Sequence, residues 1–96
     1  MQFLIIGRIV AGTEIEQVLP FVKPEAAKVW ELYASDQLRS IHYIADKSGA
    51  VLFCEANNVE EINTMIAQLS MAQAGVMQFE VISLLPFTGT ESLFAQ

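Results

Sequence analysis

Only a few side chains in this sequence are suited to acid–base chemistry or to holding an anion. His42 is the only histidine, and Arg8 and Arg39 are the only arginines. Histidine gains or loses a proton near neutral pH, and arginine binds a carboxylate through two parallel hydrogen bonds. These residue types predict proton transfer on a small acid, with His42 as a catalytic acid–base residue and Arg39 or Arg8 as the group that binds the substrate.

Each of these residues also has a structural interpretation. His42 fits a core or interface histidine with a satisfied hydrogen bond, and Arg8 fits a strand end where its side chain reaches water. Arg39 and His42 are three positions apart, so an ideal strand directs them to opposite faces. A β-bulge would be needed to bring both to one site. Without it, Arg39 pairs with an acidic residue at the subunit surface.

A β-hairpin over residues 38–56 carries His42 and Arg39 and forms the centre of the predicted fold. β-Branched and aromatic residues fill 41–44, and apolar residues return at 51–53. Asp46 to Gly49 form the turn, where we expect Gly49 to supply the positive φ angle. Cys54 is the only cysteine, which excludes an internal disulfide, and its apolar strand predicts a core thiol rather than a nucleophile.

Two helices flank the hairpin in the predicted order. Thr13 and Glu16 match a capping box that starts a short turn over 14–19, and the main helix runs over 24–35 because Pro20 breaks the pattern. Asn58 and Glu61 match a second capping box. The apolar face of this main helix is expected to consist of four residues at helical spacing: Ala26, Val29, Trp30 and Tyr33. We expect the segment 70–75 to leave the second helix.

Two polar side chains of the first helix need separate interpretation. Tyr33 fits the rim of the helix, and its hydroxyl can also turn into a pocket as a substrate-binding group. Glu25 follows Pro24, which suits the first position of a helix, so the positive helix N-terminus explains the acidic side chain.

Strands over 3–10 and 76–85 complete a β-α-β-β-α-β order, which is the ferredoxin-like arrangement of an α+β domain with a four-stranded antiparallel sheet. Right-handed crossovers place both helices on one side of the sheet. The first strand is apolar on both faces, so the second face needs a cover. We therefore predict a homodimer joined sheet to sheet as a barrel, with an apolar tail after Pro86 that packs on the partner.

Composition narrows the functional classes. The chain has 96 residues, predicting one domain over 1–96, and combines 53% hydrophobic with 17% charged residues, which favours a large buried interface. A net charge of −6 disfavours nucleic acid and anionic membranes as partners. One histidine and one cysteine cannot form a standard zinc site, and no glycine-rich phosphate loop follows a strand, so we expect no cofactor. The N-terminus lacks a signal-peptide pattern, which predicts a cytoplasmic protein.

Several segments resemble the muconolactone isomerase family of the dimeric α+β barrel superfamily. They are the segment 38–43, the hairpin after it, 58–61 at the start of the second helix and 79–81 in the last strand. The likeness covers about the last two thirds of the chain. Arg39 falls on the arginine of the family motif, and Glu25 falls near an acidic residue of its first helix. Ser40 and Tyr43 stand where the family motif has a histidine and a second arginine.

The resemblance implies a ferredoxin-like dimer, or a larger assembly, with a small-molecule cleft in each subunit. Its implied activity is an isomerisation that moves a double bond within an unsaturated lactone acid by proton abstraction and redelivery, with Glu25 beside His42 as a catalytic residue. Two alternatives remain at this point. One is a non-catalytic ligand-binding or structural homodimer, and the other is a cofactor-free monooxygenase on the same scaffold.

Overall fold

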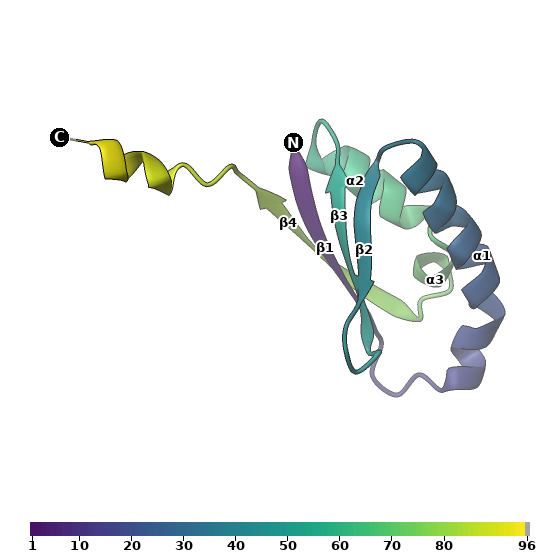
Figure 1. Cartoon of the computed structure of the whole chain (residues 1–96). Helices are drawn as coiled ribbons and strands as arrows, with labels where there is room; N and C mark the ends of the chain where they lie inside the picture. Colours follow the sequence, from purple (N-terminus) through teal and green to yellow (C-terminus); the bar gives the residue numbers. More distant parts are fainter. Residues whose placement is uncertain (96) are drawn as a thin grey trace.

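A computed structural model describes residues 1–95 as a four-stranded antiparallel sheet with helices on one side (Figure 1). The strand order is β2-β3-β1-β4. The elements are β1 (Gln2–Ile9), α1 (Ile15–Ala34), β2 (Leu38–Tyr43), β3 (Gly49–Glu55), α2 (Val59–Ala67), α3 (Ser70–Gln73), β4 (Met77–Leu84) and a 3-10 helix η1 (Gly89–Phe94). This topology confirms the predicted ferredoxin-like α+β class. None of the helices described is long and apolar enough to cross a membrane.

The first helix differs from the prediction, because α1 is continuous from Ile15 to Ala34 and contains both prolines. Each proline lacks the N–H that would bond to the carbonyl four residues earlier. Glu16, Pro20 and Pro24 lie one helical turn apart and are all exposed, so water can solvate the carbonyls left without a partner. The helix bends, as Figure 1 shows, but it does not break.

The side of α1 that faces the sheet also differs from the predicted face. Its residues recur every three or four positions: Val18, Val22, Glu25, Val29 and Leu32. Leu32 is buried, at 4% exposed, whereas Val22 is 48% exposed. The predicted face was wrong for its two aromatic residues. Trp30 is 68% exposed and Tyr33 53% exposed, and their rings stack on each other at 5.9 Å. The continuous helix therefore places Glu25 among apolar residues, well away from a helix end.

The helix starts match the predicted signals with small shifts. The predicted box of Thr13 and Glu16 is replaced one position later, where the Glu14 N–H donates to Gln17 Oε1 at 2.8 Å. At α2, Asn58 Oδ1 accepts from the Glu61 N–H at 2.9 Å, as predicted. The Glu61 carboxylate accepts from the backbone and side chain of Asn57 instead of from the cap residue. The segment predicted to be non-helical after α2 forms the single turn α3.

The turn between β2 and β3 uses a different residue for its left-handed position. Lys47 has φ 63°, whereas Gly49 begins β3 with no positive φ. The Ser48 N–H donates to Asp46 Oδ1 at 2.9 Å, and this bond, with one from the Ser48 hydroxyl, lowers the pKa of Asp46. Gly49 is needed for close packing instead, since a Cβ there would lie 1.9 Å from the Gly7 carbonyl oxygen.

The core lies between the helices and one face of the sheet, which we call the covered face. Phe3 and Ile5 of β1 are fully buried there. Its other buried members are Leu32, Leu38, Leu52, Cys54, Ile62, Met65 and Leu69. Alternate residues along each strand point to this face, and the stripes of α1 and α2 close it.

The opposite face of the sheet carries no helix, as Figure 1 shows, and we call it the open face. The strand register assigns it a continuous apolar set: Leu4, Ile6, Val51, Phe53, Ile82 and Leu84. Phe53 is 40% exposed and Ile82 is 37% exposed. The sequence predicted that the sheet would be apolar on both sides. The pairing places this apolar set on the open face and also places polar residues there, among them Arg8, His42 and Glu80.

Residues 85–95, which we call the C-terminal arm, continue β4 and project away from the domain (Figure 1). Four large apolar side chains of the arm are 78–85% exposed: Leu85, Phe87, Leu93 and Phe94. The radius of gyration is 15.7 Å, against about 12.5 Å for a compact domain of this length. The arm therefore lacks a packing surface within its own chain.

Candidate functional site

A cavity of about 390 Å³ lies between α1 and the covered face of the sheet, near the β2–β3 turn. Its wall is mostly apolar and is formed by the helices on one side and by the strands and the β2–β3 turn on the other. The helices give Val18, Val22, Glu25, Ala26, Val29 and Met71, with Leu69 between α2 and α3; the strands and the turn give Ile9, Ile41, His42, Tyr43, Lys47, Gly49, Ala50, Leu52, Met77 and Phe79. A concave, largely apolar space with few polar groups is typical of small-molecule sites.

Glu25 contributes a carboxylate to the cavity wall from the middle of α1. Its oxygen Oε1 accepts a hydrogen bond from the Ser70 hydroxyl at 3.2 Å. Ser70 is the first residue of α3, and its hydroxyl also lies 3.3 Å from the Phe21 carbonyl oxygen. Because Glu25 sits inside the apolar stripe of a continuous helix, the helix N-terminus does not explain it. Sequence analysis could have found this signal by extending the periodicity through both prolines.

Lys47 is a cavity residue that sequence analysis did not single out. It occupies the β2–β3 turn, where its positive φ angle shapes the connection. The residues that line the cavity thus include an acidic one from α1 and a basic, exposed one from the turn. The pattern of the turn suggested only a loop lysine, since nothing local indicates that a helix passes over the hairpin.

His42 borders the cavity from edge strand β2. Its register partner is Val51, which pairs in turn with Ile6, so the strand pattern directs the imidazole to the open face. Ser40 shares that face. The strand pattern therefore separates the two predicted catalytic side chains: Glu25 lies on the covered side of the sheet, and the His42 imidazole points to the open side.

The three predicted substrate-binding residues do not line this cavity. Tyr33 stacks on Trp30 at the surface. Arg8 is exposed on the open face, where it pairs with Gly49 and Gln78. Arg39 is exposed at a register shift between Leu38 and Ser40. This register shift leaves Arg39 without a paired residue on β3, and Ser40 and His42 after it follow the open face.

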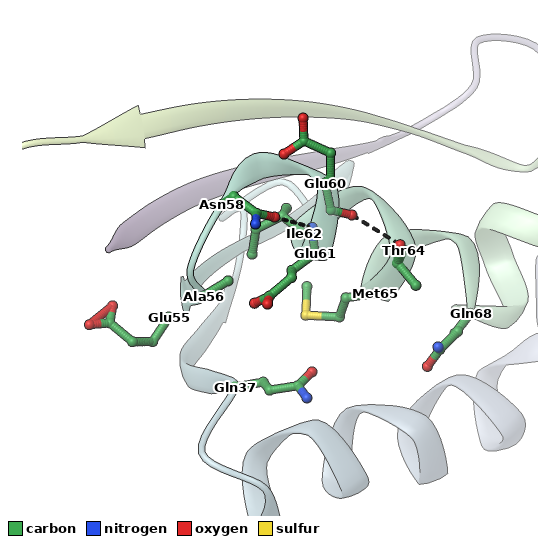
Figure 2. A pocket seen from close by; sticks show the side chains of 10 residues that line it. All are labelled: Gln37, Glu55, Ala56, Asn58, Glu60, Glu61, Ile62, Thr64, Met65 and Gln68. Carbon is green, nitrogen blue, oxygen red and sulfur yellow. Dashed lines mark hydrogen bonds between the residues drawn. The ribbon is translucent and has the colours of Figure 1, made fainter.

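A second cleft, of about 560 Å³, lies between the end of α1, the end of β3 and α2 (Figure 2). Its charged residues are all acidic: Glu55, Glu60 and Glu61. Figure 2 shows the bond between Asn58 and the Glu61 backbone that starts α2. Backbone and side-chain hydrogen bonds from Asn57 lower the pKa of Glu61, so this carboxylate fixes the β3–α2 connection.

No other reactive group stands out in residues 1–95. Burial raises the pKa of the Cys54 thiol to about 11, so the sulfur is protonated and inert in the core. Within the described chain, no group of three or more histidine, cysteine, aspartate and glutamate side chains is placed to hold a metal ion.

The comparisons with known proteins rest on structure. No family model matches the chain, and no curated protein sequence matches it. A solved structure of muconolactone isomerase is 17% identical and covers 92% of both chains, with a TM-score of 0.75. The 5-chloro-2-hydroxyhydroquinone dehydrochlorinase of Burkholderia phenoliruptrix, solved with 2,5-dihydroxybenzoquinone, is 19% identical over 88% of this chain and 94% of that chain, with a TM-score of 0.74.

An antibiotic biosynthesis monooxygenase is more distant, with 11% identity, a TM-score of 0.53 and coverage of 90% of this chain and all of the other. Three activities thus occur on similar scaffolds, and identities this low establish the fold alone. The chain has a ferredoxin-like fold, and muconolactone isomerase is among the solved structures that it resembles.

Proposed function

We propose that the chain is a cofactor-free enzyme that moves a proton on a small unsaturated lactone or carboxylic acid, as an isomerase of the muconolactone isomerase type does. One observation carries the proposal: Glu25 lines a largely apolar cavity, and its carboxylate accepts a hydrogen bond from Ser70, whose neighbours Leu69 and Met71 line the same cavity. A carboxylate in such a cavity is suited to abstract a proton next to a carbonyl and to return it at another carbon. His42 is the second candidate for proton transfer, but the register directs its imidazole to the open face, so it would serve a ligand that reaches the edge strand β2 from that side.

The substrate in this proposal is an apolar molecule with one anionic group. Lys47 is the cation of the cavity wall, so it binds the carboxylate of the substrate and stabilises the enolate-like charge that develops during proton transfer. Arg39 and Arg8 lie outside the wall and would reach a ligand only if its anionic end extended toward β2 or the open face.

The direct test is hydrogen exchange. A panel of unsaturated lactones and their acids is incubated with the protein in D2O, and proton NMR follows loss of the signal next to the carbonyl. A general base contributes about 10²- to 10⁴-fold, so Glu25→Gln should lower the exchange rate by at least about 100-fold. Glu16→Gln is the matched control on the exposed side of the same helix and should exchange at the parental rate.

The variants separate the possible roles. Lys47→Met should weaken binding of acids more than binding of neutral lactones, while Lys23→Met, on the exposed side of α1, should change neither. Exchange that survives Glu25→Gln and disappears in His42→Ala would transfer the catalytic role to His42. Oxygen consumption with a phenolic substrate, in place of exchange, would favour the monooxygenase alternative.

A second function, a ligand-binding or structural homodimer without turnover, is favoured by the open face and the C-terminal arm. We propose that two copies pack open face to open face, and that the arm of each copy lies on the other. This arrangement covers the two apolar surfaces that a single chain leaves in water. Light scattering at micromolar concentration should give twice the mass of the chain or a multiple of it, and a mass of 10.6 kDa would contradict the proposal.

A further inference from the structure

The Ser70 hydroxyl lies between two oxygen atoms of α1. One is the Glu25 carboxylate at 3.2 Å, and the other is the Phe21 carbonyl at 3.3 Å. Glu25 and Phe21 are four positions apart, so both oxygens belong to the same side of the helix. Leu69 and Met71, on either side of Ser70, both line the cavity. The fold of α3 against α1 therefore fixes this three-group contact directly beside the candidate site.

A hydroxyl group has one proton to donate and two lone pairs to accept with. An ionised carboxylate only accepts, so Ser70 must then donate to Glu25. A protonated carboxyl group can donate its own proton to Ser70, which frees the Ser70 proton for the Phe21 carbonyl. The same three groups thus have a complete hydrogen-bond arrangement for each protonation state of Glu25, and the change requires only rotation of one hydroxyl.

We propose that Ser70 is the positioning residue of a proton carrier and holds Glu25 in one place in both its ionised and its protonated form. This inference rests on the proposed function of Glu25. A group that takes a proton from one carbon and returns it to another must keep its position through both steps. The Phe21 carbonyl is the second partner that makes this possible, because it accepts the Ser70 proton while Glu25 carries the substrate proton.

The test needs no substrate. Carbon NMR of the labelled protein follows the Glu25 carboxyl carbon and the Phe21 carbonyl carbon across a pH series. The other titratable residues that line the cavity are Lys47, His42 and Tyr43. The two carbons should titrate together in the parent protein. In Ser70→Ala, the Glu25 carbon should still titrate and the Phe21 carbon should lose its response. Ser70→Thr, which keeps the hydroxyl, should restore it.

Glu25→Gln provides the reciprocal variant and leaves Ser70 in place, so the test stands even if Ser70→Ala fails to fold. In this variant the Phe21 carbonyl should no longer follow pH. A Phe21 carbon that is silent in the parent protein, or that titrates equally in Ser70→Ala, would overturn the proposal. Failure of the proposed function is recognised separately, because it would abolish deuterium exchange on every substrate without altering these carbon resonances.

Where a substrate exchanges, Ser70→Ala should lower its rate by about 10- to 100-fold, as expected for a misplaced reacting group. The Michaelis constant should change less than the turnover, since Ser70 acts on the substrate only through Glu25. A variant with unchanged turnover would contradict the positioning role even if the carbon resonances behaved as expected.

Discussion

The two faces of the sheet both contain apolar residues, but they differ in polar content and in surroundings. On β1, Phe3 and Ile5 are fully buried under the helices, while Leu4 and Ile6 between them are only half-buried on the open face. The covered face also contains the cavity with Glu25 and Lys47. The open face contains Arg8, His42 and Glu80, and none of these makes an ion pair within residues 1–95. The covered face is a buried core that contains a pocket, and the open face is a mixture of exposed apolar and charged residues.

The hydrophobic pattern of one strand alone therefore does not distinguish a core from an interface. The centre of β1 is apolar on both sides, as expected where both sides of a sheet are buried, whereas the first half of β4 alternates. Only the placement of the helices decides which side a single chain covers.

The largest expected effect comes from truncating adjacent isoleucines of β1. Ile5→Ala should lower the free energy of unfolding by about 2–5 kcal/mol, because it leaves a cavity in a filled core. Ile6→Ala should cost less at low protein concentration and more at high concentration, where the open face is proposed to be covered. Urea denaturation at several concentrations measures both. Equal, concentration-independent losses would contradict the distinction between the faces.

Placing a charge on the open face should dissociate the assembly. Phe53→Glu buries an unpaired carboxylate in the proposed interface, which is strongly unfavourable, while the domain itself keeps its core. Light scattering should report monomers, and circular dichroism should report intact secondary structure. Ile15→Glu is the matched control, since Ile15 is 67% exposed on α1, and it should leave the mass unchanged.

Thiol chemistry compares the neighbouring positions Phe53 and Cys54 of β3. Burial raises the pKa of Cys54 to about 11, so at pH 8 roughly one thiol in a thousand is ionised and alkylation should wait for unfolding. Phe53→Cys adds a thiol on the open face, which should react quickly in the monomer and slowly in the assembly. The thiol has a pKa of about 11 in the folded protein and of 9.0 as a free group. The free energy of unfolding should therefore decrease as pH rises from 9.0 toward 11, because only the unfolded chain then loses the proton. Rapid alkylation of native Cys54 would contradict its burial.

The smallest expected effect lies outside both faces. It concerns the β2–β3 turn, where Asp46 accepts hydrogen bonds, and the β3–α2 connection, where Glu61 does. Hydrogen bonds lower the pKa of Glu61 from 4.5 and of Asp46 from 3.8. Their stabilisation is complete above those values and is lost as pH falls through the lowered ones. The denaturation midpoint should therefore decrease as the pH is lowered below about 4.5. The decrease should be smaller in Glu61→Gln. An identical acid response in that variant would show that Asn57 does not bond to this carboxylate.

Much of the fold could be predicted from the sequence because its signals are local. The hairpin, the cap at Asn58 and the apolar stripe of Ile62 and Met65 follow from residue types and spacing, and all are present. The first helix was predicted less well. A proline is a strong local signal, but Pro20 and Pro24 face water in the structure, where their lost hydrogen bonds cost little, and tertiary packing keeps the helix continuous.

The candidate site could be predicted only in part. Glu25 was identified, but it was interpreted as a helix-start residue, because the helix was expected to begin at Pro24. Lys47 and Ser70 were missed, since their meeting with α1 depends on how the hairpin turn and α3 pack against it. The roles assigned to Arg39, Arg8 and Tyr33 stay predictions, and their positions outside the cavity wall make them secondary candidates.

A small-molecule site on the covered face can be tested most directly by amide NMR spectra recorded with a panel of small lactones and carboxylic acids. A bound compound should shift the resonances of Val29, Ile41 and Ala50 on the cavity wall most strongly. Acids should bind more weakly to Lys47→Met. Shifts concentrated at Gln37 and Gln68 of the acidic cleft, or no shifts with any compound, would contradict a site on the covered face.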